Sequence, residues 1–208
     1  FANIAHGCNS VIATKFALSH SDYVVTEAGF GGDLGGEKFI DLKCRLNNLN
    51  PSAVVLVATI RALKSHSEDE NSLEKGLENL EKHIGNFTKI FNKEVIVAIN
   101  KFDDDSEKDI KEVKAFCQSK KVEAIVANSF ADGGKGALEL AKAVTKLCEN
   151  SSQLKFAYNL QDNLGKKISN LERNKYGLGA MELYLKTQEH SKKYQKYAKN
   201  MPIIVAKT

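Results

Sequence analysis

Short apolar runs alternate with amphipathic stretches along this chain, and the alternation predicts strands separated by helices. The runs at 53–59, 94–100 and 122–128 are continuously apolar or nearly so. Such runs are typical of parallel strands that are buried on both faces of a sheet. A β-branched run at 22–29 ends in glycine and predicts a further buried strand. A last strand is expected at 203–206.

Apolar residues at helical spacing fill the intervals between these runs. The pattern predicts helices at 9–20, 37–46, 72–91, 106–120, 137–148, 160–172 and 181–197. Ser106 is the expected N-cap of its helix, with Asp109 in the position of a capping box. Helices of this length between strands indicate right-handed βαβ crossovers. The fold class is therefore α/β, with an open, Rossmann-like parallel sheet between layers of helices.

Composition narrows the class of protein further. The 208 residues are 42% hydrophobic and 27% charged, which is typical of a globular chain. A net charge of +4, from 30 basic and 26 acidic residues, is too mild to indicate a nucleic-acid partner. The four cysteines are too widely spaced for a CxxC pair, so neither a metal site nor a disulfide framework is expected. With no signal peptide and no apolar run that spans a membrane, we expect a cytoplasmic protein.

A glycine-rich stretch follows the strand predicted at 22–29. Glu27, Gly29 and Gly31 lie where backbone amides approach an anion closely ahead of a helix N-terminus. The stretch is not a P-loop, because Glu37-Lys38 stands where Lys-Ser or Lys-Thr is needed. A tight turn between strand and helix explains the glycines equally well, and both interpretations stay open.

The strand at 94–100 ends in Asn100-Lys101-Phe102-Asp103. This matches the NKxD pattern with which GTPases bind guanine, and it predicts a GTPase-like nucleotide-binding module. The alternative is a strand end ahead of an acidic helix N-terminus, where carboxylates favour the helix dipole.

Two aromatic residues occupy equivalent places after neighbouring strands. Phe102 follows the strand at 94–100, and Phe130 precedes a glycine turn that includes Gly133 and Gly134. In a parallel sheet the carboxyl ends of strands form the ligand site. The two rings are therefore candidates for the walls of a slot for a flat heterocycle. The alternative is that each ring is a core residue packed beneath its loop.

The N-terminal block carries His6, Cys8, Asn9 and Ser10 just ahead of a helix. Asn9 or Ser10 is the expected N-cap. A Cys–His nucleophile pair is the weaker interpretation, because nearness in sequence says nothing about geometry. We favour a polar loop that caps the helix and contacts a ligand. The chain opens at Phe1 and closes on 201–208, which resembles a strand cut just after its end. We therefore expect an internal piece of a longer chain.

Several blocks occur in the order in which they are found in one enzyme family. They are FANIAHGCNSVIATK, DYVVTEAGFGGDLGGEKFIDLKCR, VVLVATIRALK, VAINKF and DGGKGALELA, with Tyr176-Gly177 and the closing AKT. Together they cover essentially the whole chain, which resembles formate–tetrahydrofolate ligase. The long glycine-rich block with its KCR ending is the most specific of them.

The resemblance implies a P-loop NTPase-like domain joined to further α/β domains, and a homotetramer. The implied substrates are ATP with Mg, formate and tetrahydrofolate, with a monovalent cation as a further cofactor. The implied P-loop portion of the same chain lies upstream of this sequence, so the piece alone is expected to be inactive. We expect residues 1–60 to end the ATP-binding domain, 61–150 to form the folate-side domain and 151–208 to form a helical segment that returns to a strand.

The family also implies roles for individual residues. It stacks the pteridine between two aromatics, which here are Phe102 and Phe130, with Gly133 and Gly134 in the turn beside them. Phe130 stands where the family has tryptophan, which keeps a π face but reduces its area. Residues implied near the adenine and ribose are His6, Asn9, Ser10, Lys207 and Thr208.

The family block accounts for Asn100 and Phe102, and leaves Lys101 and Asp103 of the NKxD pattern incidental. The stretch 65–71 is shorter than in many bacterial members. The leading hypothesis is a ligase piece. The second is the GTPase-like module, and the third is a folded piece without ligand affinity.

Overall fold

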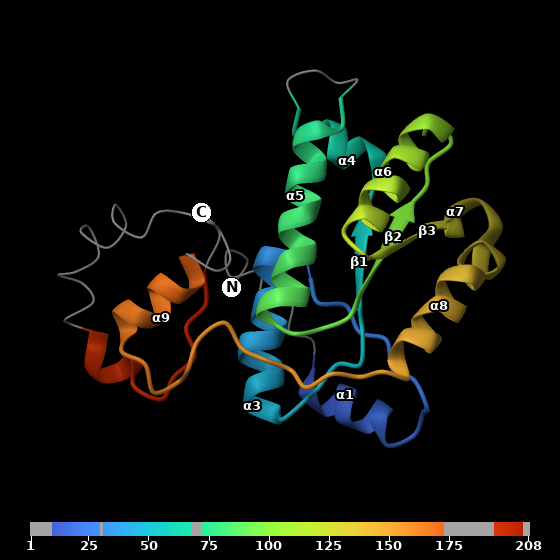
Figure 1. Cartoon of the computed structure of the whole chain (residues 1–208). Helices are drawn as coiled ribbons and strands as arrows, with labels where there is room; N and C mark the ends of the chain where they lie inside the picture. The colour runs from blue at the N-terminus through green and yellow to red at the C-terminus, as the bar shows by residue number, and fades with distance from the viewer. Residues whose placement is uncertain (1–9, 30, 68–71, 173–193, 206–208) are drawn as a thin grey trace. The chain divides into compact units, whose positions relative to one another are not determined.

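The computed structural model describes residues 10–29, 31–67, 72–172 and 194–205. Figure 1 shows the whole chain as a cartoon. The chain divides into two compact units, one formed by Pro51–Leu154 and the other by Phe1–Asn50 together with Lys155–Thr208.

Three parallel strands form the sheet of the Pro51–Leu154 unit. They are β1 (Val54–Ala58), β2 (Val95–Asn100) and β3 (Glu123–Ala127), in the order β1-β2-β3. Val54 lies opposite Val95, and Ile96 lies opposite Glu123. The three strands were all predicted, and the α/β class with a parallel sheet is confirmed.

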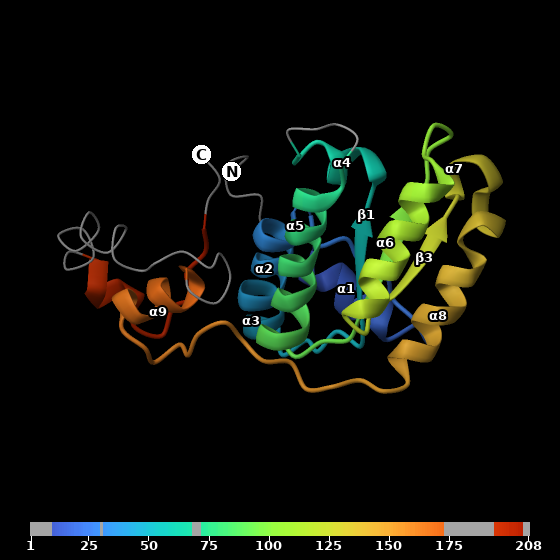
Figure 2. The same cartoon turned by 45° about the horizontal axis from the view of Figure 1, so that its top comes forward.

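Helices connect and cover these strands. They are α4 (Ile60–Lys64), α5 (Glu74–Gly85), α6 (Glu107–Ser119), α7 (Ser129–Asp132) and α8 (Leu138–Cys148). Helices α5 and α6 lie side by side (Figures 1 and 2), and Lys120 joins them through an ion pair of 2.6 Å with Glu81. The predicted apolar face of α5 is confirmed, because Leu77, Leu80 and Ile84 are buried. Burial of this face, rather than helix propensity alone, stabilises a helix of this length.

N-caps start two of the helices close behind the strand ends. The Thr59 hydroxyl accepts a hydrogen bond of 3.1 Å from the Ala62 amide at the start of α4. The Ser106 hydroxyl accepts one of 3.1 Å from the Asp109 amide, which confirms the predicted cap of α6. The Asp109 carboxylate contacts Lys64, at 2.7 Å. Hydrogen bonds from Lys64 and Ser106 lower the pKa of Asp109.

The prediction that β1 is buried on both faces is wrong. Val55 is 39% exposed and Val57 is 63% exposed, whereas every apolar side chain of β2 is buried. β1 and β3 are the two edge strands of the described sheet, and the middle residues of β3 are likewise only half-buried, although α8 packs against β2 and β3. Alternate side chains of β1 point to the same face, so Val55 and Val57 lie together on the exposed side of this strand.

The second unit contains α1 (Val11–Leu18), a long helical stretch from Gly31 to Asn47, and α9 (Leu164–Leu171). The long stretch alternates π-helical turns (Gly31–Gly35 and Phe39–Cys44) with α2 (Gly36–Lys38) and α3 (Arg45–Asn47). The glycine-rich stretch that follows residues 22–29 is therefore helical from Gly31 onward.

Two predicted strands of this unit are wrong. Residues 22–29 and 203–205 are described and belong to no strand. A strand needs a neighbouring strand with which to pair, and neither segment joins the sheet that the described residues form. Val25 is accordingly 94% exposed rather than buried. Residue 206 of the predicted last strand lies outside the described residues. Most of the predicted helix 181–197 does so too, and its described part, from residue 194, is helical up to residue 198.

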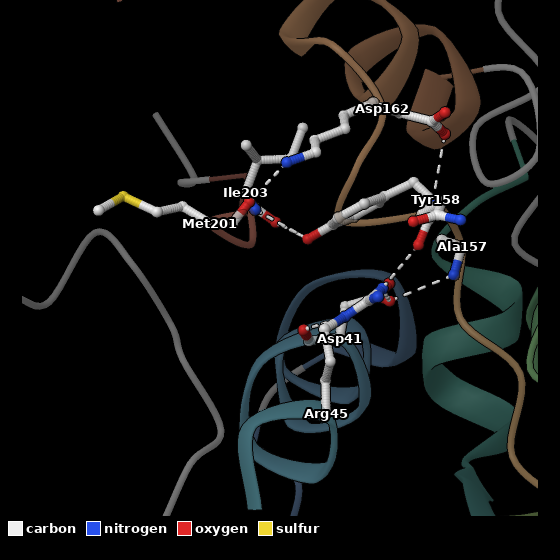
Figure 3. Close-up of polar contacts among 9 residues, drawn as sticks. Asp41, Arg45, Ala157, Tyr158, Asp162, Met201 and Ile203 are labelled. Atoms are coloured by element: carbon white, nitrogen blue, oxygen red, sulfur yellow. Dashed lines mark hydrogen bonds and ion pairs between the residues drawn. The ribbon is translucent and has the colours of Figure 1, made fainter. Parts of the chain in front are cut away.

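A polar network ties the helical stretch to later parts of the same unit (Figure 3). The fully buried Asp41 carboxylate accepts hydrogen bonds from Arg45 at 2.5 Å and from the Ala157 amide at 3.2 Å. Arg45 also donates to the Tyr158 carbonyl at 3.0 Å, and its guanidinium lies over the Phe156 and Tyr158 rings. A planar, permanently charged guanidinium suits such a site, because it stacks and forms several hydrogen bonds at once.

The Tyr158 hydroxyl extends this network to the end of the described chain. It donates to the Ile203 carbonyl and accepts from the Ile203 amide, both at 2.8 Å. Burial, together with the nearby Asp41 carboxylate, raises the pKa of Tyr158. The buried Lys167 ammonium donates to the carbonyls of Ala198 and Met201 at 2.7 and 2.8 Å. These bonds hold the segment 198–203 in place within its unit.

Candidate functional site

A cleft lies at the carboxyl ends of the three strands. Its volume is about 380 Å³, and it is lined by Arg61, Lys101, Phe102, Asp103, Asp104, Asn128 and Phe130. Each strand leads into one part of the wall, and Figure 2 shows α4 and α7 at this same end of the sheet. This is the edge at which open parallel sheets bind ligands.

A second hollow of about 410 Å³ lies at the other end of β3. It is lined by Lys114 and Gln118 of α6 and by residues 121–124, which lead from this helix into β3. No aromatic ring lines it, and it opens at the amino end of the strand, where parallel sheets do not place their ligand sites. We therefore assign the candidate site to the carboxyl-end cleft, although the two hollows are similar in size.

Phe102 occupies the centre of the cleft, directly after the middle strand. Its amide donates to the Asp105 carboxylate at 2.8 Å, and its carbonyl accepts from the Asp105 amide at 3.1 Å. These two bonds close a tight turn with Phe102 at its start. The residue is 38% exposed, so its ring is accessible from the cleft.

Arg61 lies over the Phe102 ring, with its guanidinium carbon 4.6 Å from the ring centroid. One of its terminal nitrogens contacts the Asp104 carboxylate at 2.7 Å. The hydrogen bond from Arg61 lowers the pKa of Asp104. The interpretation of the sequence missed both residues. Arg61 is the second residue of the helix that follows β1, and this position alone does not distinguish it from the other charged residue of that helix, Lys64.

Phe130 lies in α7, close behind β3, and is 95% exposed. The alternative interpretation, that Phe102 and Phe130 are core residues beneath their loops, is wrong for both rings. The Asn128 side-chain amide donates to the Asp132 carboxylate at 2.7 Å across α7. The backbone amide of Asn128 donates to the Gly136 carbonyl at 3.1 Å. The turn that carries Phe130 is thus held at both ends.

Two glycines of this turn are fixed by geometry. Gly133 has φ of +55°, in the left-handed region that favours glycine. A Cβ on Gly136 would lie 2.2 Å from the Asn128 carbonyl oxygen, a distance that backbone atoms do not tolerate. Gly134 is different, because a Cβ there meets no atom within 4 Å.

We expect Gly136→Ala to destabilise the chain by at least about 1–3 kcal/mol, because the added methyl group forces the turn away from Asn128. Gly134→Ala serves as the matched control and is expected to stay within roughly 0.5 kcal/mol of the parent chain. Urea unfolding of both variants measures the difference. Equal losses at the two positions would contradict the close approach described at Gly136.

Of the NKxD residues, Lys101 and Asp103 line the cleft, and Asn100 is the last residue of β2. The Lys101 ammonium contacts the Glu107 carboxylate at 2.9 Å, and this hydrogen bond raises the pKa of Lys101. The lysine is thereby engaged with the start of α6.

The remaining predicted site residues belong to the other unit. Ser10 is the N-cap of α1, and its hydroxyl accepts from the Ala13 amide at 3.1 Å. Gly29 and Gly31 both have left-handed φ angles, of 81° and 78°. The Glu27 carbonyl accepts a hydrogen bond of 3.1 Å from Thr26. His6, Asn9, Lys207 and Thr208 lie outside the described residues, so their predicted roles stay predictions.

Two kinds of feature do not occur in the described part of the chain. No group of three or more His, Cys, Asp or Glu side chains that is suited to hold a metal ion occurs there. Within the same residues, no helix combines the length and the apolar character that crossing a membrane requires.

Comparison with known proteins identifies the family. The family model described as formate–tetrahydrofolate ligase matches residues 1–208. A curated protein of that name from Campylobacter concisus (strain 13826) is 48% identical over the whole chain. Proteins of the same name from Porphyromonas gingivalis (strain ATCC BAA-308 / W83) and Symbiobacterium thermophilum are 46% and 44% identical, also over the whole chain.

The chain spans about 40% of the length of these curated relatives. The GTPase-like interpretation of residues 100–103 finds no support in the comparisons, which agree on one family. By sequence along its entire length, this chain belongs to the formate–tetrahydrofolate ligase family.

Proposed function

We propose that this chain supplies the tetrahydrofolate side of an ATP-dependent ligase that formylates tetrahydrofolate. In this reaction a formate oxygen attacks the γ-phosphorus of ATP, the bond from that phosphorus to ADP breaks, and formyl phosphate forms. The N10 amine of tetrahydrofolate then attacks the formyl carbon. Phosphate leaves, and the amine loses its proton, which gives 10-formyltetrahydrofolate.

The observation that carries this proposal is the pair of exposed aromatic rings just beyond the carboxyl ends of β2 and β3. Phe102 and Phe130 line one cleft of about 380 Å³, a size that accommodates a flat bicyclic ring. A pterin presents two π faces, which offset stacking on phenylalanine favours.

The polar residues of the same cleft fit a heterocycle that donates and accepts hydrogen bonds. Asp103 supplies carboxylate acceptors, and Asn128 supplies both an acceptor and a donor. Gly133 and Gly134 leave the backbone of the α7 turn accessible, because no atom lies within 4 Å of the place a side chain would occupy. We assign them to the rim that the folate approaches.

We further propose the arrangement that the family resemblance implies for the rest of the protein. Residues 1–60 end a P-loop NTPase-like, ATP-binding domain, 61–150 form the folate-side domain, and 151–208 form a helical segment. His6, Asn9, Ser10, Lys207 and Thr208 contact the nucleotide, and the loop at Glu27, Gly29 and Gly31 lies near the anion.

ATP is used with Mg and a monovalent cation, by a homotetramer in the cytoplasm. We assign neither cation to residues of this part, because the described side chains contain no group of three or more candidate ligands.

The proposal is tested in a complete ligase of the relatives' length that carries this sequence. With formate, ATP and tetrahydrofolate we expect 10-formyltetrahydrofolate, ADP and phosphate in equal amounts, and no product when formate is omitted. The 208-residue chain alone is expected to bind tetrahydrofolate and to show no turnover, because the P-loop that the family resemblance implies is not among its residues. Binding of GTP in preference to tetrahydrofolate would favour the rejected GTPase-like interpretation.

A further inference from the structure

Arg61 has no role in the proposed chemistry, yet it holds a defined position against the central ring of the cleft. We infer that Arg61 is a positioning residue. It covers one face of the Phe102 ring, and it directs the flat substrate to the opposite face, toward Phe130. This inference rests on the proposed function, since it specifies how the same cleft orients its ligand.

The order of the strands is the first step of the argument. β2 is the middle strand, so Phe102 emerges between the ends of β1 and β3. Arg61 comes from the β1 side, through α4, and Phe130 comes from the β3 side, through α7. A guanidinium already lies 4.6 Å from the centroid of the Phe102 ring. The open face of that ring is consequently the one directed to β3 and Phe130.

The chemistry of the guanidinium is the second step. A planar cation over an aromatic face is attracted by the ring quadrupole, and it covers the ring as a flat group does. Asp104 holds Arg61 at 2.7 Å through one terminal nitrogen, which limits rotation of the plane. Two hydrogen bonds between Asp105 and the Phe102 backbone fix the turn from which the ring projects. Arg61 thus contacts the ring itself, and Asp105 holds the backbone of the same residue.

A rival explanation is that Arg61 binds an anionic group of the substrate directly. Its side chain is 61% exposed, so this role is sterically open. The two explanations differ in whether the effect of Arg61 depends on Phe102, and a double-mutant cycle separates them.

The experiment measures the KM values for tetrahydrofolate and ATP in the complete ligase. We expect Arg61→Ala to raise the folate KM roughly two- to fivefold, the range of an exposed cation–π contact, with the ATP KM unchanged. Arg61→Lys keeps the charge and loses the plane, so it is expected to restore little of the loss. Asp104→Asn is expected to give a smaller rise. In the Phe102→Ala background, Arg61→Ala is expected to add nothing.

Lys75→Ala is the matched control. Lys75 forms an equally exposed ion pair with Glu78, with side chains 62% and 61% exposed, and it does not line the cleft. We expect this variant to leave both KM values unchanged. Full rescue by Arg61→Lys, or a further rise of the folate KM in the Phe102→Ala background, would overturn the positioning role.

Failure of the inference and failure of the proposed function give different patterns. If Phe102→Ala raises the folate KM while Arg61→Ala leaves it unchanged, the inference alone is wrong. If neither variant changes the folate KM, the assignment of the folate to this cleft is wrong. The Phe102 ring resonance offers a second measurement, because removal of the cation above the ring is expected to shift it in Arg61→Ala before any ligand is added.

Discussion

Replacing Phe102 by alanine is expected to raise the KM for tetrahydrofolate several-fold or more in a complete ligase that carries this sequence, with a smaller effect on ATP. The ring lines the centre of the cleft and is partly exposed. An aromatic pair contributes about 0.5–1.5 kcal/mol beyond its buried area, and stacking of a base on an aromatic side chain is worth about 1–3 kcal/mol. Steady-state kinetics with each substrate varied in turn give both constants.

Phe116 provides the control for this substitution. It is a half-buried phenylalanine of α6, it also carries a cation over its ring (Lys120, 5.1 Å from the centroid), and it does not line the cleft. Phe116→Ala is expected to reduce stability and to leave the folate constant unchanged. A raised ATP constant with an unchanged folate constant in Phe102→Ala would reverse the assignment of the cleft.

Asp41→Ala is expected to have the largest effect on stability. The carboxylate is fully buried and contacts Arg45, whose side chain is only 8% exposed, at 2.5 Å. Removing one partner of a buried pair leaves the other charge desolvated and uncompensated, which costs about 3–5 kcal/mol. The Ala157 amide loses its acceptor as well. The free energy of unfolding of the 208-residue chain, from a denaturant titration, measures the loss.

Two further variants make this prediction sharper. Asp41→Asn keeps an acceptor for Arg45 and removes the charge, so it is expected to lose a smaller part of the stability. Glu78→Ala breaks an ion pair that is 61% and 62% exposed, and exposed pairs contribute about 0–1 kcal/mol. Similar losses for Asp41→Ala and Glu78→Ala would show that the buried network does not stabilise its unit in this way.

The sheet of the Pro51–Leu154 unit could be predicted because its signals are local. Continuous apolar runs mark β1, β2 and β3, and the hydroxyl of Ser106 marks the start of α6. Segments 22–29 and 203–205 carry similar β-branched patterns and yet form no strand. A strand depends on a partner that is distant in sequence, and its own residues cannot supply that information.

The candidate site was predicted in part for the same reason. Phe102 and Phe130 could be found, because each comes shortly after a strand of the same parallel sheet, and the carboxyl ends of such strands lie at one edge. Arg61 and Asp104 were missed, because their contact joins residues from two different connections of the sheet. Charged residues are common in such connections, so nothing in the pattern distinguishes Arg61 from the neighbouring Lys64.

The buried charges of the other unit illustrate a further limit. Charged side chains are rarely fully buried, yet Glu37, Lys38 and Asp41 all are. Buried charge requires partners, and those of Asp41 include Ala157, which is remote in sequence. The alternation of π and α turns between Gly31 and Asn47 likewise has no known sequence signal in this pattern.

The most direct test of the central claim is the NMR response of the phenylalanine rings of this chain to tetrahydrofolate. The chain has 10 phenylalanines, and the variants Phe102→Leu and Phe130→Leu assign the two that matter. We predict that the folate shifts both ring resonances through its ring current, and that ATP shifts neither. Saturating folate that shifts other rings while Phe102 and Phe130 stay unchanged would contradict the account.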